Sequence, residues 1–139
     1  MNEPVYPPLI IDGVDRYAQH QAWLCAEEIP YDRRVSFGGV EPVQLEIRHA
    51  DFDDADLRGA KLREADLRGA YLRRADLSGA DLRAVNLRGA DLRDADLTGA
   101  NLAGADLSDA KLTGAYLFGA YLFGADLYDT DMTGAKMGD

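Results

Sequence analysis

The sequence is poor in the residue types that build metal centres and nucleophilic active sites. It contains one cysteine, Cys25, and two histidines, His20 and His49, in 139 residues. A single cysteine cannot form an internal disulfide, which fits a reducing compartment, and it leaves no Cys/His spacing of the zinc-binding type. None of the serines lies in the context of a nucleophile elbow. We therefore predict no catalytic, cofactor-binding or metal-binding residues and no enzymatic activity.

Basic residues and long apolar runs are also scarce. The chain has 15 Lys and Arg against 25 Asp and Glu, which gives a formal net charge of -10. This balance disfavours binding to a phosphate backbone or to an anionic membrane. No apolar run approaches the roughly 18 residues of a membrane span, and the N-terminal Met-Asn-Glu-Pro lacks the basic and apolar regions of a secretory signal. We therefore expect a cytoplasmic protein that binds neither nucleic acid nor membrane.

What the sequence does contain is a five-residue repeat. From residue 50 to residue 139, alanine recurs at every fifth position with two exceptions, Val85 and Thr130. A large apolar residue, usually leucine, follows two positions after each of these places. These 90 residues, divided by five, give 18 consecutive repeats. The frame continues upstream less regularly, so we predict a repeat domain over residues 35–139, with unambiguous repeats over 50–139, and a separate segment over residues 1–34.

A period of five fits neither a helix nor a flat strand. It would wind the leucines around a helix, and it would send successive leucines to opposite faces of a strand. Within one repeat, however, Ala and Leu are two residues apart and point the same way from an extended piece. Pairs such as Arg58-Gly59 fit a type II turn, whose third position needs positive φ. Each repeat is therefore predicted to form a short straight edge and a corner, with Ala and Leu inside a coil.

Glycine spacing bears on the number of edges per coil. A step of ten residues fails along the chain, whereas a step of twenty persists as Gly59, Gly79, Gly99 and Gly119. Stacked corners should share one turn type, so we predict four repeats per coil. The 18 repeats then make about four and a half coils, with a rise of about 4.8 Å per coil.

Repeats such as Ala65-Asp66-Leu67-Arg68-Gly69 resemble those of the pentapeptide repeat family, and the resemblance covers residues 50–139 without a gap. It implies an all-β solenoid, namely a right-handed quadrilateral β-helix of about five coils. Because the family is functionally diverse, the resemblance implies much more about architecture than about function.

The segment before the repeats has a different pattern. Asp12 is a candidate N-cap for a helix that runs through Val14, Tyr17 and Leu24 on one face, with Trp23 on the other side. A repeat rod has an open apolar end that needs a cover. We therefore expect an N-terminal helical cap in which Tyr17, Trp23 and Leu24 contact the rod, with a partner-binding helix as the alternative.

Aromatic residues gather at outward positions in the last coils, where an Ala/Leu core does not explain them. These residues are Tyr116, Phe118, Tyr121, Phe123 and Tyr128. The final coil is also expected to expose its apolar core. Aromatic side chains anchor interfaces, so we predict a two-fold homodimer joined through the C-terminal coils. Simple stacking of neighbouring rings along the rod is the alternative.

Charged residues occupy fixed outward places as well, with Asp often before the leucine and Arg often after it. On a twenty-residue coil Arg73 lies under Arg93, so Asp residues on the same face must offset the repulsion. Residues 46–98 hold 10 basic and 12 acidic residues, whereas residues 99–139 hold 2 and 6. We interpret the first half as an ion-pair surface rather than a set of catalytic carboxylates. A candidate acidic face for a partner consists of Asp56, Asp76 and Asp96.

Two classes of function remain open. The first is a rigid scaffold that docks a protein partner, whose identity the sequence does not specify. The second is implied by the resemblance: some family members mimic duplex DNA, bind DNA gyrase or topoisomerase IV, and inhibit the enzyme or protect it from quinolones. The net charge of -10 favours mimicry, whereas the Arg-rich first half and the short rod oppose it. We therefore expect a scaffold for protein–protein interaction.

Overall fold

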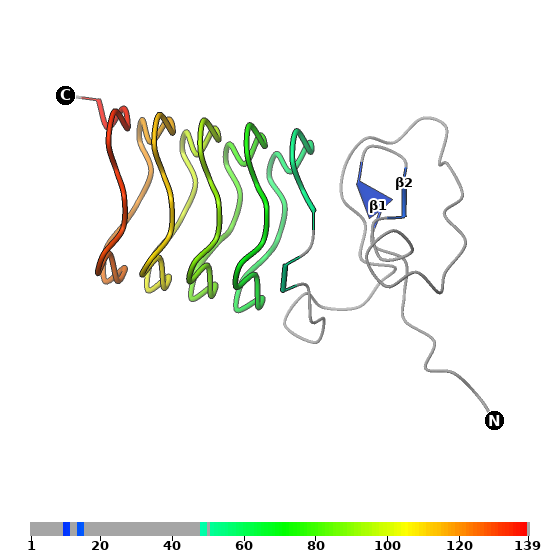
Figure 1. Cartoon of the computed structure of the whole chain (residues 1–139), viewed down its shortest axis with the longest axis horizontal. Coiled ribbons are helices and arrows are strands. Elements are labelled where there is room, and N and C mark those ends of the chain that lie inside the picture. The colour runs from blue at the N-terminus through cyan, green and yellow to red at the C-terminus, as the bar shows by residue number, and fades with distance from the viewer. Residues whose placement is uncertain (1–9, 12–13, 16–47, 50, 139) are drawn as a thin grey trace.

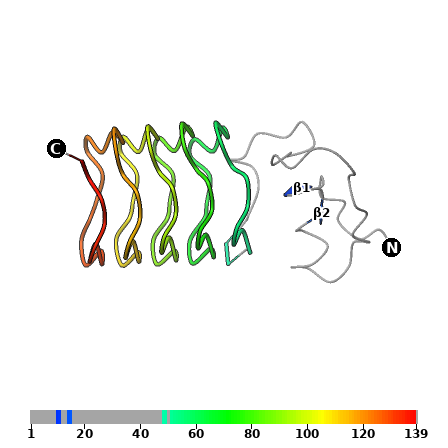
Figure 2. The same ribbon diagram turned by 90° about the horizontal axis from the view of Figure 1, so that it is seen from above.

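Residues 51–138 wind into a stack of coils. The computed structural model describes residues 10–11, 14–15, 48–49 and 51–138 of the chain. Figure 1 shows the coils side by side, from teal near the start of the stack to red at the C-terminal end, and Figure 2 shows the same stack from above. The described residues include no helix of the length and apolar character needed to cross a membrane.

Parallel backbone pairs join residues that are twenty apart, such as Asp51 with Tyr71 and Asp56 with Asp76. One coil therefore contains four repeats, as predicted. On two sides of the stack, five successive repeats are paired one above another, and these rows end at Asp131 and Lys136. On each of the other two sides, four repeats are paired in this way. This count confirms the expected four and a half coils.

The stack has four faces, each built from one repeat of every coil. The first face contains residues 51–55, 71–75, 91–95, 111–115 and 131–135; the second contains 56–60, 76–80, 96–100, 116–120 and 136–138; the third contains 61–65, 81–85, 101–105 and 121–125; the fourth contains 66–70, 86–90, 106–110 and 126–130.

Three backbone hydrogen bonds per repeat hold neighbouring coils together. On the second face, Leu57 N donates to Asp76 O over 2.8 Å, Gly59 N donates to Ser78 O over 2.9 Å, and Asp76 N donates to Ala55 O over 3.0 Å. The same pattern recurs on the other faces. Each straight edge is so short that it forms a single bridge pair with the next coil, and the coils contain no continuous strands within residues 51–138.

Each corner is closed by one hydrogen bond, for example from Ala60 N to Leu57 O over 3.0 Å. The residue at the third place of the turn has positive φ at every corner from residue 49 to residue 134, and Gly59 has a φ of 64°. This is the type II pattern that was predicted. However, non-glycine residues such as Arg74 and Ala84 adopt the same φ, at 60° and 54°. All four corners of a coil are therefore alike, and glycine does not mark one of them.

The core consists of the alanine and leucine of each repeat, as predicted. Every leucine from Leu57 to Leu117 is at most 2% exposed. At the inward place where Thr130 replaces alanine, its hydroxyl donates to Leu107 O over 2.7 Å, so this polar group has a partner. In the final coil, Leu127 and Met137 are 39% and 49% exposed, which confirms the expected open core there.

The predicted N-terminal helix is wrong at its start. Strand β1 (Ile10–Ile11) pairs antiparallel with strand β2 (Val14–Asp15), and Ile11 lies opposite Val14. The intervening Asp12-Gly13 is typical of two-residue hairpin loops, and β-branched residues flank it on both sides. These signals outweigh the interpretation of Asp12 as an N-cap. The expected cap residues lie outside the described residues: Tyr17, Trp23 and Leu24.

The core of the coil is tested by two neighbouring substitutions. Leu92 is fully buried, so Leu92→Asp places an unpaired charge in the core and is expected to cost more than about 4 kcal/mol of unfolding free energy. Arg93 points outward and pairs with Asp91 at the surface, so Arg93→Ala is expected to lower the melting temperature far less than Leu92→Asp does. Thermal melts followed by circular dichroism compare the two variants. Equal losses would contradict the assignment of inward and outward places.

Candidate functional site

The interior of the stack is filled by alanine and leucine side chains, so any binding chemistry must lie on the outward residues. Within the part of the chain that the structure describes, no group of three or more His, Cys, Asp or Glu side chains is arranged to hold a metal ion. The candidate surfaces are an ion-pair cluster on the first face, a column of aspartates on the second, and a belt of aromatic side chains near the C-terminal end.

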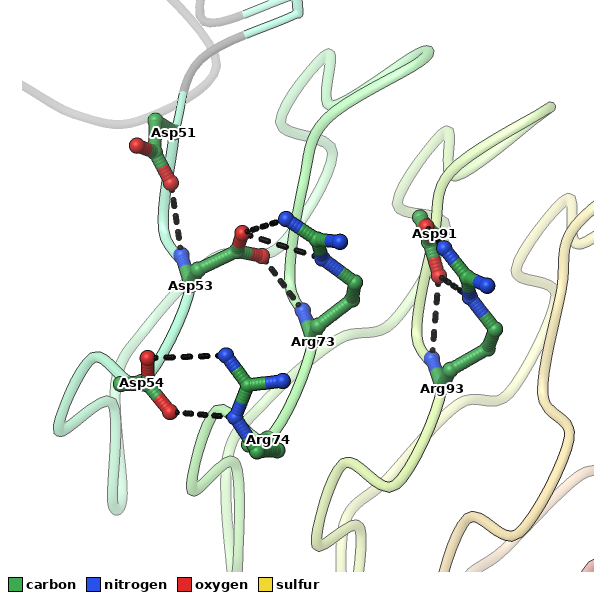
Figure 3. Close-up of polar contacts among 7 residues, drawn as sticks. All are labelled: Asp51, Asp53, Asp54, Arg73, Arg74, Asp91 and Arg93. Atoms are coloured by element: carbon green, nitrogen blue, oxygen red, sulfur yellow. Dashed lines mark hydrogen bonds and ion pairs between the residues drawn. The ribbon is translucent and has the colours of Figure 1, made fainter.

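The ion-pair cluster joins successive coils of the first face (Figure 3). The Asp53 carboxylate accepts hydrogen bonds from Nη2 and Nε of Arg73, over 2.6 and 3.1 Å, and from the Arg73 backbone N–H over 2.8 Å. Beside it, Asp54 accepts from Nε and Nη2 of Arg74 over 2.7 and 3.1 Å. Both pairs connect residues twenty apart, so side chains reinforce the backbone register between two coils.

Other Asp–Arg pairs form within a single repeat. Arg93 donates from Nη2 and Nε to the two carboxylate oxygens of Asp91, over 2.6 and 2.8 Å. Asp66 and Arg68 form the same fork, with contacts of 2.7 and 2.9 Å. The aspartate before the leucine therefore neutralises the arginine after it. This arrangement confirms the ion-pair interpretation of the first half of the repeats.

These hydrogen bonds affect the charge state of the carboxylates. The Arg68, Arg83 and Arg93 guanidinium groups hold the pKa values of their aspartate partners below the usual range, and partial burial opposes this effect only in part. A general acid needs a pKa that is raised toward neutrality. The paired aspartates are instead ionised at neutral pH and have a structural role.

The predicted acidic column does line up on the second face. Asp56 pairs with Asp76, and Asp76 with Asp96, through parallel backbone bridges on successive coils. At the next two levels the column continues with Tyr116 and Lys136. Its acidic part therefore covers three coils only.

The carboxylates of this column already have partners. Asp56 accepts two hydrogen bonds of 2.8 Å from the Arg58 guanidinium. Asp76 accepts from the Ser78 hydroxyl over 2.6 Å, and its Oδ2 lies 3.9 Å from Arg58 Nε. The column is consequently an aspartate ladder with local hydrogen bonds, rather than a bare row of negative charges.

Among the residues that the structure describes, the aromatic belt is the main exposed apolar feature. It consists of Tyr116, Phe118, Tyr121, Phe123 and Tyr128, which lie on the second, third and fourth faces of one coil. Their exposed fractions range from 39% to 76%, so all five point outward as predicted. The ring centroids are 6.4 Å apart for Tyr116 and Phe118, and 6.2 Å apart for Tyr121 and Phe123.

Two features of the surface were not anticipated from the sequence. The Lys136 Nζ lies 4.1 Å from the ring centroid of Tyr116, in a cation–π contact. Lys136 follows Tyr116 by twenty residues, so the coil period itself could have indicated this pair. Tyr71 is also exposed, on the first face, among charged residues.

The family model for pentapeptide repeats matches the chain with 8 copies, over residues 50–89, 75–114 and 100–139. A search of curated proteins found no match. Several solved structures do match the coils.

Two of these structures are pentapeptide repeat proteins. The first is HetL, which is involved in heterocyst differentiation regulation in the cyanobacterium Nostoc sp. strain PCC 7120. Its sequence is 44% identical to this chain and the TM-score is 0.62. The match covers 64% of this chain and 41% of HetL. A protein from the Arabidopsis thaliana thylakoid lumen is 35% identical with a TM-score of 0.60, over 61% of this chain and 59% of that protein. The matched part therefore spans less than two thirds of either relative. Proteins of this kind form right-handed quadrilateral β-helices, and the coils of this chain share that fold.

A third match is more distant. QnrB1, a plasmid-mediated fluoroquinolone resistance protein, is 18% identical with a TM-score of 0.34, over 66% of this chain and 64% of that protein. A likeness at this level carries no argument about function.

The ion pairs predict a defined response of stability to acid. Because the pKa of Asp91 is lower in the folded chain than its ordinary value of 3.8, its pairing stabilises the fold above that pH and is lost as the pH falls through and below it. Asp91→Asn is therefore expected to cost about 1 kcal/mol at neutral pH and progressively less as the pH falls below 3.8. Urea unfolding at several pH values measures the difference from wild type. The control is Asp129→Asn, at an exposed corner, and a pH-independent difference for Asp91→Asn would refute the prediction.

Proposed function

We propose that this chain, which belongs to the pentapeptide repeat family, is a non-enzymatic rigid scaffold that binds other proteins through its outward side chains. The observation that carries the proposal is the aromatic belt on a rod whose core is already filled. Five outward aromatic side chains in one coil contribute nothing to that core. Aromatic residues are enriched in the buried centres of protein interfaces, where they dominate the binding energy.

The backbone supports this role because it fixes the positions of the outward residues. Every described repeat is tied to a neighbouring coil by backbone hydrogen bonds of 2.7–3.0 Å, and the ion pairs of the first face add side-chain links between coils. A surface held in this way loses little conformational entropy on binding, so more of the contact energy contributes to affinity.

Self-association is the simplest use of the aromatic belt. Phe118 and Phe123 lie at equivalent places on adjacent faces, and Phe123 is the most exposed of the belt residues. A two-fold pairing of two chains through these coils would bury the belt against itself and point the N-terminal ends apart. We therefore propose a homodimer through the C-terminal coils as one state of the scaffold.

Mimicry of DNA is the less favoured alternative. A mimic needs a long face of unpaired negative charge, whereas the aspartate ladder of the second face covers three coils and is hydrogen-bonded by Arg58, Ser78 and Thr98. The adjacent third face carries arginine and lysine. The charge pattern thus supports protein docking by a mixed surface more than replacement of a duplex.

The dimer is tested by Phe118→Ser combined with Phe123→Ser. Light scattering at high concentration is expected to report a dimer for the wild type and a monomer for the double variant, with unchanged circular dichroism. The matched control is Arg58→Ser with Arg63→Ser, which alters the same places on the same two faces sixty residues earlier. A monomeric wild type, or an equal effect of the control, would contradict the proposal.

The two function classes are separated by a supercoiling assay with purified DNA gyrase, with and without a quinolone. Excess chain is expected to leave both supercoiling and quinolone inhibition unchanged. Inhibition or protection by the wild type that disappears when Asp56, Asp76 and Asp96 are changed to Asn would instead establish the mimic.

A further inference from the structure

The four faces of the rod differ in net charge. Within residues 51–138, the first face has six acidic and four basic residues, the second has three and two, and the fourth has five and two. The third face has two acidic and three basic residues, for a net charge of +1, in a chain whose formal net charge is -10. An acidic ligand would therefore meet the least electrostatic repulsion on the third face.

The charges of the third face are grouped at one end. Parallel bridges connect Lys61 to Asp81, Asp81 to Asn101, and Asn101 to Tyr121, so these residues form one column along four coils. The neighbouring column, twenty residues per step, contains Arg63, Arg83, Ala103 and Phe123. The face thus runs from a basic end, through a band of small or uncharged residues, to an aromatic end.

Two cations at the basic end form no hydrogen bond to a carboxylate among the described residues. The Arg63 side chain is 58% exposed, and its Nε lies 3.9 Å from Glu64, a long contact. Lys61 is exposed and has no ion pair among the described residues. Arg83 differs from both because it donates to the two oxygens of Asp81 over 2.7 and 2.8 Å. Lys61 and Arg63 therefore remain available to an external anion.

The aromatic end forms a small platform. The rings of Tyr121 and Phe123 are stacked, with an interplanar angle of 28°, and both are largely exposed. The inward neighbours Leu122 and Ala125 pack against the core, which fixes the backbone beneath the rings. Such a platform offers a preformed apolar contact for one large side chain.

The spacing of the two ends defines the ligand. The platform and the Lys61–Arg63 pair are three coils apart, or about 14 Å at about 4.8 Å per coil. An extended peptide covers that distance in about four residues. We propose that the third face binds an extended acidic segment of a partner protein, with an aromatic residue on Tyr121 and Phe123 and carboxylates about three to four residues away on Lys61 and Arg63.

This proposal rests on the scaffold function and names its partner class. A basic segment would be drawn to the three net-negative faces instead. A second copy docked along the whole length of the third face would bring two faces of net +1 together. The homodimer proposed above uses only the aromatic end of this face, where Phe123 lies, and would compete with the acidic segment for that end. The third face is a strip about 20 Å long and one repeat wide. The area of such a strip is far smaller than the roughly 800 Å² per partner that a standard interface buries.

The test is a fluorescence-polarisation titration with fluorescein-labelled peptides, at chain concentrations where light scattering reports a monomer. The probe contains the sequence Phe-Ser-Gly-Glu-Glu; one comparison peptide replaces both Glu by Lys, and another replaces Phe by Ala. A ten-residue oligothymidine is the fourth probe, because a basic face with aromatic rings also suits single-stranded nucleic acid. The acidic aromatic peptide is expected to bind about tenfold more tightly than each of the others.

The location of binding is tested with matched variants. Lys61→Glu with Arg63→Glu, and separately Phe123→Ser, are each expected to weaken binding of the acidic aromatic peptide about tenfold. The controls on the fourth face are Arg68→Glu with Arg88→Glu, which makes the same change in charge, and Tyr128→Ser. These controls are expected to change the affinity less than about twofold.

Several results would overturn the inference: no binding of the acidic aromatic peptide, tighter binding of the basic peptide or of oligothymidine, or equal losses for the variants of the third and fourth faces. The proposed function is judged separately. If the peptide fails to bind while Phe118→Ser with Phe123→Ser still converts a dimer to a monomer, the scaffold function stands and only the assignment of the acidic ligand falls.

Discussion

The backbone hydrogen bonds between coils are the constraint on which the rest of this structure depends. They join each residue to a partner about twenty positions away, three bonds for every repeat. Because a backbone donor in such a short edge has no other partner within reach, the register cannot slip by one residue without losing all three bonds and turning leucine outward. The core, the corners and the outward columns all follow from this register.

The register also explains how charge and aromatic character are distributed. Residues twenty apart stack on one face, so a change of residue type along the chain becomes a change of surface along the rod. The Asp53–Arg73 pair bridges two coils, whereas Asp91 and Arg93 form a pair within one repeat. The Tyr116–Lys136 contact has the same period. A partner that binds to one face therefore contacts the outward residues of every fourth repeat. It does not contact the three repeats between them.

Much of the fold could be predicted from the sequence, because the inward places admit few residue types. The alternation of alanine and leucine identified the core, and the outward aromatic residues were located correctly. The twenty-residue spacing of glycine predicts four repeats per coil, which is correct, but the corners do not require glycine. Asp94 and Ala84 adopt positive φ as readily as Gly79 does here, since the ladders on both sides of the corner fix its conformation. Tertiary hydrogen bonding thus overrides the local preference that made glycine informative.

Other features could not be predicted because they depend on competing local choices. Asp12 is compatible both with a helix N-cap and with a hairpin loop, and the pairing of β1 with β2 reflects β-branched neighbours that the helical interpretation neglected. The partner of Arg73, by contrast, is identifiable from the sequence. The place two residues before it in its own repeat holds Tyr71, so only Asp53, one coil earlier, offers an anion.

The equivalence of the corners has a consequence for how such a chain can change in length. Insertion or deletion of a single repeat would preserve the core, since alanine and leucine would still face inward. It would, however, rotate every later repeat to the next face, separating Asp54 from Arg74 or Tyr116 from Lys136 if the change fell between them. Only changes in multiples of twenty residues keep each surface intact. The smallest change in length that preserves the core is therefore one repeat, whereas the smallest that preserves the outward surfaces is a whole coil.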